Sequence, residues 1–412
     1  MKKLHFWLFA ALFAASFAVV GCGDDEVTPS NSGLENNTET KDTTTTDTIT
    51  TDTTTTDTIS TDTISIDTVA NARLVSITYN GTSATVDIPT DLTEEITAEV
   101  NGAHVVITNT NETDETEFQL TGSSTNGSFT YNGTYKSTLS LNGLSLQSQQ
   151  GAALNILCGK RIAVILEDST TNTLSDYAAG DQKACFYCKG HVEFEGGGTL
   201  NVTGNLTHAI KTKEYMQLKK STGVINILGA AGDAIHVGQY YLQSGGTVNI
   251  TSTTQADGIQ VEVTTLDDDI TPDPDDENNG QVIINGGNIN IEVAHEDCEG
   301  IKCDSLITIQ GGTFNITASG NGSRGIQTDG NMVVGEESGK TSITIAAKGG
   351  LCTAAADADD PHRCMGIKVD GNLTVNAGTI TVTNTGTKSR GIRVGTYTKN
   401  GGTVNATIKK DA

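Results

Sequence analysis

The chain has 412 residues, with 46 glycines, only 5 prolines, 5% aromatic residues and a formal net charge of −25. A surface this acidic repels nucleic acid and anionic lipid, so neither is an expected partner. It would also repel an acidic polysaccharide unless a cation intervened.

The N-terminus has the features of an export signal. Two lysines precede an apolar run, residues 4–20, which is too short and too early for a convincing membrane span. The run ends in Val19-Val20-Gly21-Cys22, which resembles the bacterial lipobox, whose cysteine is diacylated. We therefore expect residues 1–22 to be a lipoprotein signal peptide with lipidation at Cys22. The acidic residues 23–26 resemble the run that sends some lipoproteins to the outer face of the outer membrane, so we expect a surface-exposed lipoprotein there, with the periplasmic face as the alternative.

Residues 23–70 contain almost no large apolar side chains, so they cannot bury enough surface to offset chain entropy, and we expect a disordered tether. An Asp-Thr pair recurs in it every five residues, from Asp42-Thr43 to Asp67-Thr68. This five-residue repeat resembles a short O-glycosylation sequon of certain Gram-negative phyla, and glycans would stiffen the tether. A plain acidic spacer of low complexity explains the same composition.

Downstream of the tether, a short phrase of a small residue, an isoleucine and a polar residue recurs. The isoleucines are separated by 25, 24, 42, 25, 41 and 25 residues, and they are Ile210, Ile235, Ile259, Ile301, Ile326, Ile367 and Ile392. Between them a glycine turn followed by alternating residues recurs, as in Gly245-Gly246-Thr247-Val248-Asn249-Ile250. A unit of about 24 residues with short period-2 strands, glycine turns and no helical pattern is what one coil of a β-solenoid requires.

Other repeat folds explain this pattern less well, because the Leu and Asn spacing of leucine-rich repeats is missing and an antiparallel sandwich would not keep a fixed period. We therefore predict an all-β fold, a single-stranded right-handed parallel β-helix over residues 101–412. Its coils, about 4.8 Å apart, would stack their inward side chains into continuous apolar ladders. The two long intervals are interpreted as ordinary coils with inserted loops, 264–280 and 349–363. Residues 71–100 are less regular and are expected to cap the open end of the solenoid.

Several phrases, taken in order, resemble those of a family of carbohydrate-binding β-helix proteins first described in a cellulolytic clostridium and common in gut anaerobes. They are Leu141-Asn142-Gly143-Leu144-Ser145-Leu146, Gly151-Ala152-Ala153, Thr171-Asn172-Thr173-Leu174-Ser175-Asp176 and Asp257-Gly258-Ile259. The resemblance implies a pectate-lyase-like fold, calcium between coils, and binding of plant-wall polysaccharide without established cleavage. The sequence departs from the family's pattern where the Asp of the Asp-Gly-Ile phrase is replaced, at Glu299, Arg324, Met365 and Arg390.

Acidic residues recur at equivalent positions of neighbouring coils. Aligned on the repeated isoleucine, they form two levels, Asp233, Asp257, Asp297 and Glu299 at one and Asp304 and Asp329 at the other. Two carboxylates about 4.8 Å apart repel by roughly 3.5 kcal/mol at an effective dielectric of 20, so such a ladder favours a bound cation. We predict calcium at these acids, because it prefers hard oxygen ligands from several residues. The alternative is that pairs such as Asp329-Gly330 are simply turns.

Two sets of outward side chains are candidate glycan contacts. The asparagine at the centre of the repeated alternating phrase, as at Asn226 and Asn249, is expected to form a ladder of amides, although such ladders usually serve to stabilise stacking. Tyr215 and Tyr240 each lie five residues after the repeated isoleucine, in adjacent coils. Aromatic residues in this arrangement can form a platform for sugar rings, and they can equally pack against a loop.

The chain has 8 cysteines, and lipidation of Cys22 leaves an odd number in an oxidising compartment. The close pairs Cys298 with Cys303 and Cys352 with Cys364 are predicted to be local disulfides. The remaining three cysteines would leave one thiol unpaired.

Three classes of function are compatible with this sequence. The first is a cell-surface protein that binds polysaccharide without cleaving it. The second is a calcium-dependent polysaccharide lyase, in which an Arg or Lys removes the proton α to a calcium-bound uronate carboxylate. Its candidate bases show no shared constellation in the sequence, and they are Arg324, Arg363, Arg390 and Lys302. The third is a structural adhesin. We expect the first, because the flank of a solenoid suits an extended polymer and the replaced aspartates are ligands that a lyase-like calcium cluster would need.

Overall fold

The computed structural model of the protein describes residues 73–411 except 253–255, 265–277, 337–339 and 353–361. The predicted signal peptide and tether therefore lie outside the described residues. Within the described part, every regular element is a β-strand apart from one 3-10 turn, η1 (Thr90–Leu92). No helix there is long and apolar enough to cross a membrane.

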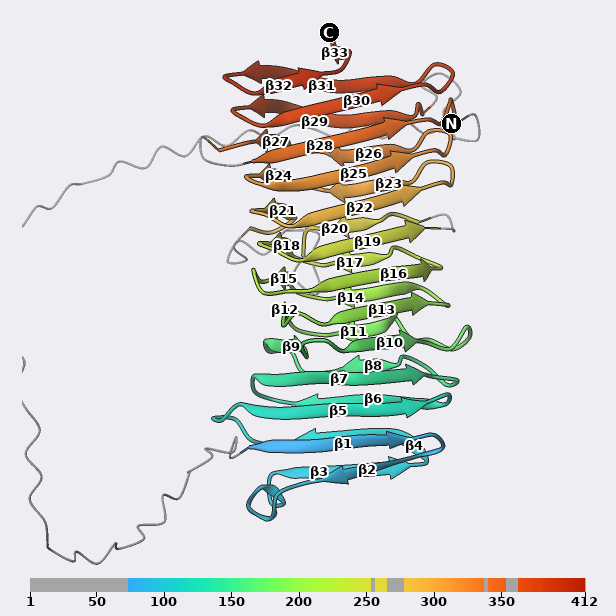
Figure 1. Ribbon diagram of the computed structural model, residues 1–412, viewed down its shortest axis with the longest axis vertical. Coiled ribbons are helices and arrows are strands. Elements are labelled where there is room, and N and C mark those ends of the chain that lie inside the picture. The colour runs from blue at the N-terminus through green and yellow to red at the C-terminus, as the bar shows by residue number, and fades with distance from the viewer. Residues whose placement is uncertain (1–72, 253–255, 265–277, 337–339, 353–361, 412) are drawn as a thin grey trace, which may run out of the picture. The chain divides into compact units, whose positions relative to one another are not determined.

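The strands stack coil on coil from β1 to β33 in three rows of parallel pairings, and each row forms one face of the solenoid (Figure 1). The tyrosine face contains β1 (Leu74–Asn80), β5 (Thr116–Ser124), β7 (Ser137–Gln147), β9 (Ile162–Leu166), β12 (Val192–Glu195), β15 (Met216–Leu218), β18 (Tyr240–Gln243), β21 (Gln281–Ile284), β24 (Leu306–Ile309), β27 (Asn331–Val334) and the C-terminal parts of β29 (Met365–Val375) and β31 (Arg390–Lys399).

The asparagine face contains the end of β7 followed by β10 (Thr171–Ser175), β13 (Thr199–Gly204), β16 (Val224–Ala230), β19 (Thr247–Ser252), β22 (Asn288–Val293), β25 (Gly312–Ala318), β28 (Thr341–Ala347), β30 (Thr379–Asn384) and β32 (Thr403–Asn405). The isoleucine face contains β4 (Ala103–Asn109), β6 (Gly127–Gly133), β8 (Leu154–Ile156), β11 (Ala184–Cys188), β14 (His208–Thr212), β17 (Ile235–Val237), β20 (Ile259–Val261), β23 (Glu299–Cys303), β26 (Arg324–Thr328), the starts of β29 and β31, and β33 (Ile408–Lys410).

The repeated isoleucines stack directly on one another inside the solenoid. Ile235 pairs in register with Ile210 on one side and Ile259 on the other, and all three are fully buried. The register also joins Ile259 to Ile301 and Ile326 to Ile367, so the long intervals are coils with insertions, as predicted. Burial of one such side chain contributes roughly 1.5–3 kcal/mol, and the ladder repeats this at every coil. The predicted all-β solenoid of parallel coils is confirmed, while its right-handedness stays a prediction.

Antiparallel strands close the N-terminal end. β2 (Ser83–Asp87) pairs antiparallel with β1, and β3 (Ile96–Asn101) pairs antiparallel with β4. β1 and β4 then pair in parallel with β5 and β6, so the parallel coils begin directly on these hairpins. The hairpins overlap the predicted cap, residues 71–100, although β4 lies beyond it and β1 already belongs to a parallel row. β2 and β3 cover strand edges that would otherwise be free to pair with another chain.

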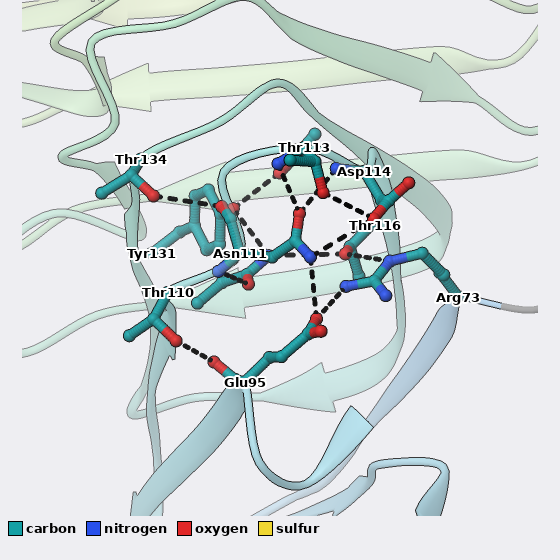
Figure 2. Close-up of polar contacts among 11 residues, drawn as sticks. Arg73, Glu95, Thr110, Asn111, Thr113, Asp114, Thr116, Tyr131 and Thr134 are labelled. Atoms are coloured by element: carbon teal, nitrogen blue, oxygen red, sulfur yellow. Dashed lines mark hydrogen bonds and ion pairs between the residues drawn. The ribbon is translucent and has the colours of Figure 1, made fainter. Parts of the chain in front are cut away.

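A polar network fastens these hairpins to the first coil (Figure 2). Arg73 Nη2 lies 2.5 Å from Glu95 Oε2, and the same carboxylate accepts a hydrogen bond of 3.0 Å from Asn111 Nδ2. Asn111 Oδ1 in turn accepts the backbone N–H groups of Thr113 and Asp114, at 2.9 and 2.6 Å. One asparagine therefore holds the loop between β4 and β5 and also connects it to the turn that precedes β3.

Candidate functional site

The outer surface of the isoleucine face is a strip of charged and polar side chains. The residue after each repeated isoleucine lies in register along the coils, and this row comprises Lys211, His236, Gln260, Lys302, Gln327, Lys368 and Arg393. Because side chains alternate along a strand, these residues point away from the core that the isoleucines fill. A second outward row follows three residues after the isoleucine, and it includes Glu262, Asp304, Asp329 and Asp370.

The residues two positions before the isoleucine use their side chains to hold the next coil. His208 Nδ1 accepts the backbone N–H of Asp233 at 3.0 Å, and Asp233 Oδ1 accepts that of Asp257 at 3.1 Å. Asp257 Oδ1 accepts the N–H of Glu299 at 2.8 Å. The repeated Asp therefore satisfies a backbone donor at the start of each following strand, which gives it a structural role that the spacing alone did not indicate.

In the next coil, the residue two positions before the isoleucine is Arg324, a positively charged residue where the preceding coils have an acid. The Arg324 guanidinium is hydrogen-bonded to Glu299 and lies 3.2 Å from Asp297 Oδ1, while Lys302 Nζ is 3.7 Å from Asp257 Oδ2. Burial, together with the neighbouring Glu299 carboxylate, raises the pKa of Asp257 to about 8. Four predicted calcium ligands are therefore already engaged, Asp233 and Asp257 with backbone amides and Asp297 and Glu299 with an arginine.

The remaining two predicted ligands are placed differently. Asp304 and Asp329 follow Cys303 and Thr328, which pair in register, so the two acids belong to adjacent coils. Asp304 Oδ2 accepts the Val263 N–H at 3.1 Å, and burial and the nearby acids Glu262 and Asp329 raise the pKa of Asp304. Within the described residues neither Asp304 nor Asp329 forms an ion pair. Asp304 accepts a backbone amide as Asp233 and Asp257 do, so it is the lack of an ion pair among the described residues that favours this pair as the calcium position.

One set of potential metal ligands among the described residues was not indicated by the sequence analysis. Among the described residues, only His208, Asp233 and His236 bring three potential ligand atoms within 4.8 Å of one another. The signal was present in the sequence, because the coil period places His208 beside Asp233 and the Asp-Ala-Ile-His phrase places His236 three residues after it.

A small basic pocket of about 110 Å³ lies on the C-terminal coils of the same face. Its lining residues are Arg324, His362, Arg363, Met365, Lys368, Arg390 and Arg393, and no described carboxylate lines it. Arg324 is 6% exposed, and its Nε–H has no hydrogen-bond partner among the described residues. The structure corrects the expectation that the candidate bases share no constellation, because the coil register gathers three of the four here. Lys302 lies outside the pocket.

The two predicted tyrosines form part of an aromatic stack on the tyrosine face. The rings of Tyr215 and Tyr240 are 4.8 Å apart and stacked, and His191 stacks on Tyr215 at 4.4 Å. The Tyr215 hydroxyl donates to Glu193 Oε1 at 2.8 Å. Since each coil places its ring on the ring of the next, the faces of Tyr215 are covered on both sides. Tyr215 therefore cannot stack on a sugar ring in this arrangement.

The asparagines form the ladder that the repeat predicts. Amide nitrogens donate to the amide oxygen of the preceding coil at 2.8–2.9 Å along Asn201, Asn226, Asn249, Asn290 and Asn315. Each inner amide uses one donor and its acceptor within the ladder. The side chains are aligned as expected, and their main role in this arrangement is to bind one coil to the next.

The disulfide predictions are wrong in this structure, where all seven described cysteines are free and buried thiols. Cys298 precedes β23 and Cys303 ends it, so extended backbone separates them by about 16 Å, whereas a disulfide needs Cα atoms about 4.4–6.8 Å apart. The bridge between Leu351 and Arg363 places Cys352 opposite His362 rather than opposite Cys364. The sequence intervals looked short, but strand geometry and register keep both pairs apart.

Parallel coils with a polar and charged outer strip define a β-solenoid that presents an extended surface for a ligand. Residues 101–412 match the family described as carbohydrate-binding domain-containing protein, and the chain belongs to that family. It is similar in fold to a solved structure of a polysaccharide lyase-like protein from C. thermocellum, a gadolinium derivative. The TM-score is 0.51 at 20% identity, over 65% of this chain and 99% of that chain. No protein with a curated description matches the sequence.

Proposed function

We propose that the protein is a cell-surface lipoprotein that binds acidic polysaccharide along the isoleucine face without cleaving it. Its membership of a carbohydrate-binding family supports the general activity. The basic pocket carries the more specific proposal, because it concentrates guanidinium groups on a chain whose net charge is −25. Arginine pairs with carboxylate and sulfate-like oxyanions through parallel hydrogen bonds, and Arg363 and Arg390 bring two such groups to the pocket.

The acidic overall charge disfavours an acidic polymer, but the basic pocket provides a local site where such a polymer can bind. Long-range repulsion from an acidic surface is screened within about 8 Å at physiological ionic strength, whereas a desolvated arginine contact acts at hydrogen-bond distance. A polymer with one acidic group seated in the pocket can run along the outward rows of neighbouring coils. Calcium at Asp304 and Asp329 would let a second polymer carboxylate approach the acidic part of the same strip.

Binding without cleavage is favoured over a lyase by the environment of the arginines. Arg324 is already paired with Glu299 and Asp297, so these carboxylates occupy the guanidinium that a lyase would need as its base. Moreover, four of the acids that would form a lyase-like calcium cluster are engaged by backbone amides or by Arg324.

The test is retention of the purified protein on polygalacturonate, alginate, xylan and cellulose, with calcium and with a chelator. We expect retention on the acidic polymers and a loss of at least tenfold in affinity for the double variant Arg363→Gln/Arg390→Gln. Lys399→Gln removes a positive charge from the exposed end of β31, outside the pocket, and should bind normally. Unsaturated-uronate absorbance that disappears in the double variant would identify a lyase, and retention on none of the polymers would favour a structural adhesin.

A further inference from the structure

We propose that His208, Asp233 and His236 form a binding site for a divalent transition-metal ion, with zinc as the best match. This site shares Asp233 with the acids that the sequence predicts as calcium ligands, and it is separate from the Asp304 and Asp329 position and from the basic pocket. His208 begins β14, while Asp233 and His236 flank the start of β17 in the next coil. The coil stacking that builds the solenoid therefore also brings these three ligands together.

The ligand separations are close to those of a tetrahedral zinc site. His236 Nδ1 lies 2.9 Å and His208 Nδ1 lies 3.4 Å from Asp233 Oδ2, and the two imidazole rings are 4.5 Å apart. With Zn–N and Zn–O bonds of about 2.0–2.1 Å, neighbouring ligand atoms of a tetrahedral centre are roughly 3.3–3.4 Å apart. The two contacts to Asp233 therefore need shifts of only a few tenths of an ångström, and the two imidazole ligand atoms, which lie within 4.8 Å of each other, would have to turn toward the ion, which would retain an open fourth position.

The surroundings provide the support that a metal-binding histidine usually has. His236 Nε2 lies 3.4 Å from Glu262 Oε2, so one ring nitrogen faces the proposed metal position and the other faces a carboxylate of the next coil. This arrangement orients the ring and fixes its tautomer in many metal sites. The side chains of His208, Asp233 and His236 are only 18%, 13% and 9% exposed, so water competes weakly for the ligands.

The donor set selects among metals. Two imidazole nitrogens and one carboxylate suit zinc, copper, nickel or iron, whereas calcium prefers six to eight oxygen ligands. The simpler interpretation is a hydrogen-bonded ladder, since His208 Nδ1 now accepts the Asp233 N–H. A metal at that nitrogen would displace this bond. The two interpretations differ in whether added zinc binds with defined stoichiometry.

The experiment is a calorimetric titration of the metal-free full-length protein with zinc alone, repeated in excess calcium. We expect one tight equivalent that calcium does not displace. His208→Ala and His236→Ala should each weaken it by at least 100-fold, while His295→Ala, which removes an exposed histidine outside the cluster, should leave it unchanged.

Asp233→Asn provides a second variant that keeps an oxygen acceptor for the Asp257 amide, so the coil should fold while zinc affinity falls. Circular dichroism and the melting temperature check that each variant is folded. Absence of a tight equivalent in the wild-type protein, or equal zinc binding by the His208→Ala/His236→Ala double variant, would overturn the proposal. Glycan retention is measured separately without added zinc, so failure of one proposal leaves the other testable.

Discussion

Replacing Arg324 with methionine should destabilise the solenoid strongly, because the guanidinium compensates the Glu299 carboxylate at a place that water does not reach. Glu299 is 4% exposed and Arg324 is 6% exposed. Removing one partner of a buried ion pair leaves an uncompensated charge and costs about 3–5 kcal/mol. Burial and Glu299 raise the pKa of the neighbouring Asp257 to about 8, so at neutral pH Asp257 is mostly protonated and supplies no positive charge in place of Arg324.

The expected size can be read from thermal unfolding. For about 300 ordered residues the unfolding entropy is roughly 0.6 kcal/mol per kelvin, so the melting temperature should fall by about 5–8 °C. Glu299→Gln should restore most of the loss in the Arg324→Met background, because it removes the stranded charge and keeps a similar shape. A fall of less than about 1.5 °C, or no rescue by the second substitution, would refute the argument that Arg324 acts by compensating Glu299.

Four further outcomes follow from the structure. Asn249→Ala removes two ladder hydrogen bonds and should lower the free energy of unfolding by about 1–3 kcal/mol in urea titrations; a change near zero would show that the ladder contributes nothing to stacking. Burial raises the pKa of the Asp176 carboxyl, so this group stabilises the folded state below the pKa that it has in the unfolded chain. That stabilisation is lost as the pH rises through the higher pKa of the folded state. Asp176→Asn should therefore melt at a higher temperature than the wild type at pH 7, and the difference should shrink toward pH 4. Chelation should lower the melting temperature of the wild-type protein more than that of Asp304→Asn, and equal responses would exclude calcium at that residue. Cys22→Ala should release the protein from the membrane fraction of the cells that produce it, and unchanged fractionation would end the lipoprotein interpretation.

The class of fold follows from the repeat alone, because each coil must bury the same inward isoleucine and each turn needs glycine. A fixed period forces identical positions of successive coils into register, so the stacks of Ile235, Asn249 and Tyr240 on their neighbours follow from counting residues. For the same reason the spacing of 25 residues assigns Asp304 and Asp329 to adjacent coils, as the strand register confirms.

What these aligned residues do depends on how their side chains pack in three dimensions. Counting along the chain does not show which partner a side chain selects, and so it could not reveal that Asp233 and Asp257 hold backbone amides or that Arg324 pairs with Glu299. It also could not place His362, which precedes its strand, in a pocket with Arg390 from the next coil. The period of a solenoid determines the height of each residue along the stack. Packing in three dimensions determines the direction of each side chain and the path of the inserted loops, and these set the charge pairing and the pockets.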